Sequence, residues 1–137
     1  MIEFGILCTQ KQMIENDVSF KIRGVIFKVY KNLGPGLLES VYQAALACEL
    51  RKAGCTVGIQ VPMPVVYETE HLELGFRIDL LVDNLVIIEI KSVETLHDVH
   101  HKQILTYLRL SGRKLGILVN FNTADIATSI FRKVNNL

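Results

Sequence analysis

Two neighbouring segments with strand-like alternation constrain the fold of this chain more than any other feature. Leu72–Val82 and Leu85–Ser92 are separated by Asp83-Asn84, a pair typical of hairpin turns. Side chains two positions apart on a strand share a face, so Glu89 and Lys91 point the same way. The charged residues of both segments gather toward one end of the predicted hairpin: Arg77, Asp79, Glu89 and Lys91.

The register of this hairpin decides whether Asp79 joins Glu89. A two-residue loop would pair Asp79 with Ile88, whereas a three-residue loop over residues 83–85 would pair Asp79 with Glu89. The three-residue loop leaves one face without a polar member: Ile78, Leu80, Val82, Val86, Ile88 and Ile90. A one-residue slip would bring unpaired charge onto that buried face, at a large free-energy cost. We therefore predict one cluster of Asp79, Glu89 and Lys91, which a β-bulge would also produce by another route.

This cluster has the chemistry of a hydrolytic metal site. Two carboxylates a few Å apart repel each other, and one of them keeps its proton unless a cation lies between them. Hard oxygen ligands suit Mg²⁺ or Mn²⁺, and a neighbouring lysine can position a water or stabilise charge on a phosphoryl oxygen. The alternative interpretation is a surface salt-bridge cluster on a hairpin, which is a common feature of proteins.

The rest of the chain predicts helices packed on a mixed sheet. Helices are expected over residues 17–33, 37–53 and 98–110, where apolar residues recur every three or four positions. Further strands are expected over 57–61, 65–67, 114–121 and 130–134, with a short helical turn over 123–128. Pro62 and Pro64 place the first of these strands at a sheet edge. The helix after Ser92 is long enough for a parallel crossover, so the fold class is α/β with a mixed α+β sheet. We expect one domain over residues 17–137, preceded by a loosely held N-terminal arm over 1–16.

Composition excludes several functions. The formal net charge of +1 argues against binding nucleic acid by bulk charge alone, although it allows a local basic patch. The three cysteines include no CxxC pair, which favours reduced thiols and a cytoplasmic location over a disulfide framework or a zinc ribbon. No apolar run is long enough to span a bilayer, and the first ten residues lack the pattern of a signal peptide.

Glu39 and Gln103 are the other polar residues that stand out. Glu39 heads an otherwise apolar helical stripe that is expected to face the interior, formed with Tyr42, Leu46, Leu50 and Ala53. It is read either as a first-turn glutamate favoured by the helix dipole or as a carboxylate aimed at the hairpin cluster. Gln103 lies on a helix that meets the sheet, and it is read either as solvated or as a donor to water or phosphate. His97, His100 and His101 lack a zinc-site signature, and Gly34-Pro35-Gly36 is not a phosphate-binding loop.

The motifs of the chain resemble a known family. Residues 36–42 match the GxxExxY motif that names a small prokaryotic protein family, and the resemblance extends over about Val18 to Asn135. Its other matching segments are Gln60-Val61-Pro62, Val65-Val66-Tyr67, Asp79-Leu80-Leu81-Val82, Glu89-Ile90-Lys91, Gln103 with Tyr107-Leu108, and Asn120-Phe121. The GxxExxY family is grouped with the PD-(D/E)XK nuclease superfamily.

The resemblance implies a PD-(D/E)XK nuclease-like αβββαβ core with an extra N-terminal helix. It implies that Asp79 and Glu89 are metal ligands, with the Ile90 carbonyl as a third, and that Lys91 is the catalytic lysine. Glu39 would match the glutamate of the first helix and Gln103 the glutamine that often accompanies the motif. Because the activity of this family is inherited from the superfamily, the resemblance is a fold-level argument for function.

Three hypotheses follow for the function. The first is a Mg²⁺- or Mn²⁺-dependent nuclease that hydrolyses phosphodiester bonds in DNA or RNA. Its catalytic residues would be Asp79, Glu89, Lys91, Gln103 and Glu39, and Glu39 would also be a metal ligand. Substrate would be steered by local cations such as Lys102, Arg109, Arg113 and Lys114. The second is a non-catalytic accessory module in a nucleic-acid-processing system. The third is an interaction domain with a surface ion-pair cluster. A homodimer is compatible with each, and no membrane partner is expected.

Overall fold

The computed structural model describes residues 2–137, with side chains over residues 14–72 and 75–137. Along the chain the elements are α1 (Ile2–Leu33), α2 (Glu39–Lys52), β1 (Val57–Tyr67), β2 (Glu70–Val82), β3 (Val86–Lys91), α3 (Asp98–Ser111), β4 (Leu115–Asn120), the 3-10 helix η1 (Ile126–Ser129) and β5 (Ile130–Val134). The predicted order of helices and strands, with an additional helix before an αβββαβ core, is confirmed.

The five strands form one mixed sheet in the order β1-β2-β3-β4-β5. Strands β3 and β4 are parallel, and the other three neighbouring pairs are antiparallel. Helix α3 connects the two parallel strands, as the predicted crossover requires. The proline-containing strand β1 lies at a sheet edge, as predicted. It continues through both prolines, with a register shift between Met63 and Val65.

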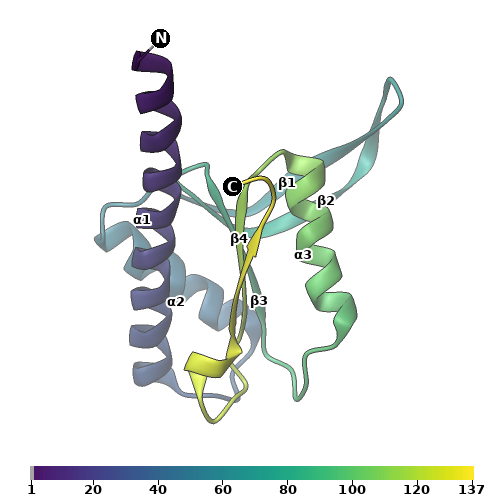
Figure 1. The fold of residues 1–137 in the computed structure, drawn as a ribbon. Coiled ribbons are helices and arrows are strands. Elements are labelled where there is room, and N and C mark those ends of the chain that lie inside the picture. The colour runs from purple at the N-terminus through teal and green to yellow at the C-terminus, as the bar shows by residue number, and fades with distance from the viewer. Residues whose placement is uncertain (1) are drawn as a thin grey trace.

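Helices cover both faces of the sheet (Figure 1). Helices α1 and α2 lie together on one face, and α3 lies on the other. The larger core cluster joins α1 and α2 to one side of the sheet, through residues such as Ile26, Leu46, Leu80, Ile88 and Val119. A smaller cluster lies on the α3 side and consists of Ile78, Leu81, Ile87 and Leu108. Both faces of β3 and β4 are therefore buried, which explains why these strands are almost continuously apolar in sequence.

Helix α1 differs most from the prediction, because it begins at Ile2 and not near Asp17. The side chains of residues 2–13 lie outside the described part of the structure, so the division into an arm over 1–16 and a domain over 17–137 stays a prediction. None of the helices in the described part of the chain combines the length and the apolar character needed to cross a membrane. The β1–β2 hairpin extends beyond the rest of the sheet as a long arm (Figure 1).

Candidate active site

The β2–β3 hairpin has the three-residue loop that the apolar pattern favoured. Leu80 pairs with Ile88 and Val82 with Val86, which leaves residues 83–85 as the loop. Asp83 and Asn84 take positive φ angles of 51° and 57°, a conformation that these two residue types tolerate better than most. The regular pairing ends at Leu80 and Ile88, and Asp79 and Glu89 lie just beyond the paired segment. The sequence argument for this register is confirmed.

Asp79 and Glu89 contact each other at the end of the hairpin. The Ile90 N–H donates to Asp79 Oδ2 at 2.8 Å, and the Asp79 N–H lies 3.4 Å from Glu89 Oε1. The Asp79 carboxylate thus accepts the hydrogen bond that a strand carbonyl would take in a regular ladder. This contact fixes the side chain of Asp79 against the backbone of β3.

The strand is irregular at this point, which corrects one detail of the predicted face. Ile78 was expected beside Leu80 on the α1–α2 side, but it packs in the α3-side cluster with Leu81 and Ile87. The β1–β2 pairing passes from Ile59–Leu80 to Val61–Ile78 and skips the residues between them. One of those is Gln60, whose φ is 50°. The alternation of β2 is therefore interrupted between Ile78 and Leu80, an outcome that strict alternation cannot predict.

The Glu89 carboxyl is the most perturbed acid of the site. Its residue is 5% exposed, and burial, together with the negative charge of Asp79, raises its pKa from 4.5 to about 8. The positive charge of Lys91 acts in the opposite direction but is outweighed. Without a cation, Glu89 therefore keeps its proton at neutral pH. A cation bound beside Asp79 and Glu89 would favour the ionised form of the Glu89 carboxyl.

Lys91 and Gln103 line one hollow beside this pair. Lys91 ends β3 and is half-buried, two residues beyond Glu89 and on the same side of the strand. The hollow measures about 520 Å³ and is lined by Lys91 and by residues of α3: Val99, His100, Lys102, Gln103 and Thr106. Gln103 Nε2 donates to the Tyr107 hydroxyl at 2.7 Å. Gln103 and Lys91 thus line the same hollow.

Glu39 lies at the edge of the site and not inside it. Its side chain is exposed, and its Oε1 accepts the Ser92 N–H at 3.2 Å, one residue beyond Lys91. The buried part of the predicted stripe is Tyr42, Leu46 and Leu50. Thus Glu39 faces the end of β3, but the predicted interior position is wrong.

Tyr42 explains how the GxxExxY segment places Glu39. Its hydroxyl donates to the Gly34 carbonyl at 2.5 Å and accepts the Leu37 N–H at 3.1 Å, which fixes the turn between α1 and α2. Its ring stacks on Phe121 with centroids 4.2 Å apart. Gly34 and Gly36 have φ angles of 69° and 94°, which favour glycine. The motif therefore builds a rigid turn that presents Glu39 to Ser92.

Two neighbours of the carboxylate pair were given no role by the sequence argument. Gln60 Nε2 donates to Asp79 Oδ1 at 3.1 Å and to Gln43 Oε1 at 2.6 Å, and so orients the aspartate. The Tyr107 ring stacks on Phe76 with centroids 4.0 Å apart, and burial followed by the charge of Glu89 raises its pKa. A polar residue inside an apolar edge strand was the available signal for Gln60. Tyr107 lies one helical turn after Gln103, which was the signal for the tyrosine.

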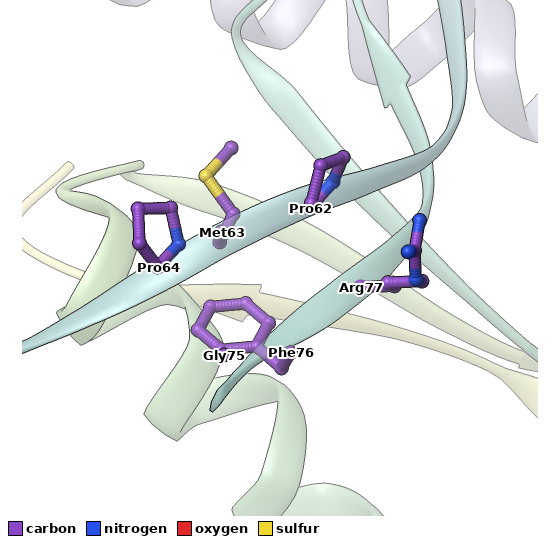
Figure 2. A pocket seen from close by; sticks show the side chains of 6 residues that line it. All are labelled: Pro62, Met63, Pro64, Gly75, Phe76 and Arg77. Carbon is purple, nitrogen blue, oxygen red and sulfur yellow. The ribbon is translucent and has the colours of Figure 1, made fainter. Parts of the chain in front are cut away.

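The other charged residue of the hairpin does not join the pair. Arg77 is exposed and its Nη1 lies 3.4 Å from the Gln60 carbonyl oxygen. It also lines a smaller hollow of about 170 Å³ on the β1–β2 arm, shown in Figure 2 with Pro62, Met63, Pro64, Gly75 and Phe76. None of the described side chains that line this hollow is a carboxylate. We therefore place the candidate active site at Asp79 and Glu89 and not on the arm.

The donor set around the pair is small. Among residues with described side chains, no three or more His, Cys, Asp or Glu side chains converge closely enough to hold a metal ion. Asp79 and Glu89 are thus two carboxylates, and any further protein ligand would be a backbone carbonyl or would act through water. Such a set suits a hard cation that keeps part of its hydration shell, as Mg²⁺ does.

Comparison with known proteins identifies the class to which this fold and site belong. The family model of the PD-(D/E)XK nuclease superfamily matches residues 16–133, so the chain belongs to that superfamily. Nucleases of this superfamily generally use divalent metal ions. No curated protein and no solved structure gave a significant match. The closer resemblance to the GxxExxY family stays a prediction.

Proposed function

We propose that this protein is a Mg²⁺- or Mn²⁺-dependent nuclease that hydrolyses phosphodiester bonds in DNA or RNA. The observation that carries the proposal is that Asp79 and Glu89 lie side by side at the hairpin end. The Asp79 N–H donates to the buried Glu89 carboxyl, the Ile90 N–H donates to the Asp79 carboxylate, and a half-buried lysine follows two residues after Glu89. An aspartate and a Glu-x-Lys segment on adjacent strands are the elements that name the superfamily. The coarser assignment, a domain of this nuclease superfamily, does not depend on the proposal.

In this proposal Asp79, Glu89 and the Ile90 carbonyl hold the ion, and Glu39 assists through a water. A bound divalent ion would act as a Lewis acid on a phosphoryl oxygen and lower the pKa of a bound water. Lys91 holds the attacking water beside the scissile phosphate and stabilises the charge that develops on it. Gln103 orients that water or a phosphate oxygen through its amide, while Gln60 keeps the Asp79 carboxylate in place.

The unusual ionisation of Glu89 supports this assignment. A buried carboxyl with a pKa near 8 makes folding less favourable at neutral pH, unless a bound cation stabilises its ionised form. A surface ion-pair cluster would have no reason to bury it. The third hypothesis, an interaction domain with a surface ion-pair cluster, is therefore the least supported.

The direct test is cleavage of labelled DNA and RNA, single-stranded and duplex, with millimolar Mn²⁺ or Mg²⁺. We expect cleavage by the parent protein and a loss of about 100-fold or more in Asp79→Asn and Lys91→Ala. Lys21→Ala is the matched control, because Lys21 is an exposed lysine on α1, in the layer across the sheet from α3. Absence of cleavage of every substrate, or undiminished cleavage by Lys91→Ala, would refute the proposal.

The same protein preparations test the alternative of a non-catalytic module. Calorimetric titration of Mn²⁺ should show binding that Asp79→Asn removes. A protein that binds nucleic acid but neither Mn²⁺ nor Mg²⁺ would be an accessory module that has kept the fold without the chemistry.

A further inference from the structure

The hollow beside Lys91 is lined mainly by side chains that are basic or can donate hydrogen bonds. Among the side chains that the structure describes, its polar members are two lysines, a histidine, an amide and a hydroxyl, without a carboxylate: Lys91, Lys102, His100, Gln103 and Thr106. Val99, Lys102, Gln103 and Thr106 follow the spacing i, i+3, i+4 and i+7 and form one face of α3, and His100 lines the hollow from the first turn of the helix. The residues offer hydrogen-bond donors and positive charge to a ligand. This is the lining expected for a phosphate-bearing ligand.

His100 has a fixed hydrogen-bonding role in this hollow. The His97 N–H donates to His100 Nδ1 at 3.0 Å in the capping box that begins α3. A ring nitrogen that accepts a hydrogen bond carries no proton, so the proton of the neutral ring is on Nε2. The ring therefore donates from its distal nitrogen without carrying a charge.

The charges around His100 favour this neutral form. Burial and then the positive charge of Lys91 lower its pKa, and the neighbouring His97 and His101 act in the same direction. Glu39 opposes them but is outweighed. His100 also lines an adjoining hollow of about 370 Å³, formed with the loop residues Val93, Glu94, Thr95 and His97. The two hollows thus meet at this side chain.

We propose that the hollow beside Lys91, through His100, Lys102 and Thr106, binds a phosphate group of the nucleic-acid backbone next to the scissile one. The inference rests on the proposed nuclease function, because it takes Lys91 as the residue nearest the reaction. Lys102 supplies a charge that releases counterions on binding, whereas His100 and Thr106 supply neutral hydrogen bonds. The three residues hold the substrate in register with Asp79 and Glu89, and they are positioning residues.

Binding measured without divalent ions separates this inference from catalysis. The probe is a fluorescently labelled DNA duplex, followed by anisotropy in EDTA at mildly alkaline pH over a series of salt concentrations. Lys102→Ala should weaken binding and reduce the slope of log K against log salt by about 0.9. His100→Asn should weaken binding several-fold and leave the slope unchanged, because the imidazole is neutral.

The variants are chosen so that folding does not decide the result. Asparagine at position 100 can still accept the His97 N–H but lacks the distal donor, and circular dichroism checks that α3 is intact. Lys21→Ala removes an equal charge on α1 and should change affinity and slope less than Lys102→Ala does. Equal effects of the two lysine variants, or unchanged binding in both Lys102→Ala and His100→Asn, would overturn the inference.

The outcomes distinguish the two proposals. If binding follows this pattern but Mn²⁺ supports no cleavage, the nuclease assignment fails and the phosphate site stands as a nucleic-acid contact. If the protein cleaves DNA while neither variant changes binding or salt dependence, the nuclease assignment stands and the phosphate site is refuted.

Discussion

Replacing Glu89 by glutamine tests the central electrostatic feature of this protein. The carboxyl is 5% exposed, and burial beside Asp79 raises its pKa from 4.5 to about 8. A raised carboxyl pKa means that the folded state holds the proton more tightly than the unfolded chain does. Stability is therefore highest at low pH, and it is lost as the pH rises from about 4.5 to about 8.

The size of the effect follows from the two pKa values. A pH of 7 is about 2.5 units above the ordinary pKa of a glutamate. Ionisation of Glu89 in the unfolded chain therefore lowers the free energy of unfolding by about 3 kcal/mol at this pH. The loss is less than about 1 kcal/mol at pH 5 and approaches about 5 kcal/mol at pH 9. Glutamine stays neutral and keeps an acceptor for the Asp79 N–H. We expect Glu89→Gln to be more stable than the parent by these amounts.

Urea unfolding of the metal-free protein, repeated across this pH range in EDTA, measures the difference. Glu70→Gln is the control, because Glu70 is exposed at the start of β2. Adding Mn²⁺ should stabilise the parent and close the gap, while Glu89→Gln gains nothing. A constant difference between parent and variant at every pH, or a variant that is less stable throughout, would refute the reasoning.

Three further outcomes are expected. Lys91→Ala should lose about 100-fold or more in cleavage yet keep Mn²⁺ affinity by calorimetry, and a parallel loss of both would make the lysine structural. Gly75→Ala should destabilise the protein by about 1–3 kcal/mol in thermal or urea unfolding, because a Cβ at this position would lie 2.1 Å from the Met63 carbonyl oxygen. The control is Gly24→Ala, which should be neutral or stabilising because a Cβ at position 24 would meet open space. Ile88→Ala should cost about 2–5 kcal/mol because Ile88 is fully buried between β2 and β4, and a smaller cost would mean that the core collapses around the gap.

The hairpin register shows how far sequence reasoning reaches. An apolar face with period two can be buried in only one register, so the pairing that brings Asp79 to Glu89 was predictable from the strands alone. The side taken by Ile78 was not predictable, because the neighbouring edge strand β1 has an unpaired residue with positive φ, Gln60, beside this part of β2, and the hairpin alone does not show it. Glu39 was placed in the right direction but at the wrong depth, since helical periodicity fixes a face and not the distance to a neighbouring strand.

The amino-acid sequence by itself determined the order of the elements, the edge position of β1 and the hairpin register that brings Asp79 near Glu89. Those features depend on local periodicity, on the positions of prolines and on the cost of burying charge, and each of these can be read from the amino-acid sequence. Only the tertiary structure decided that Gln60 would hold Asp79, that Tyr107 would stack on Phe76, and that α3 would present its donors beside Lys91. Such contacts join elements through packing angles and offsets, and these are set by the whole core and by no single segment.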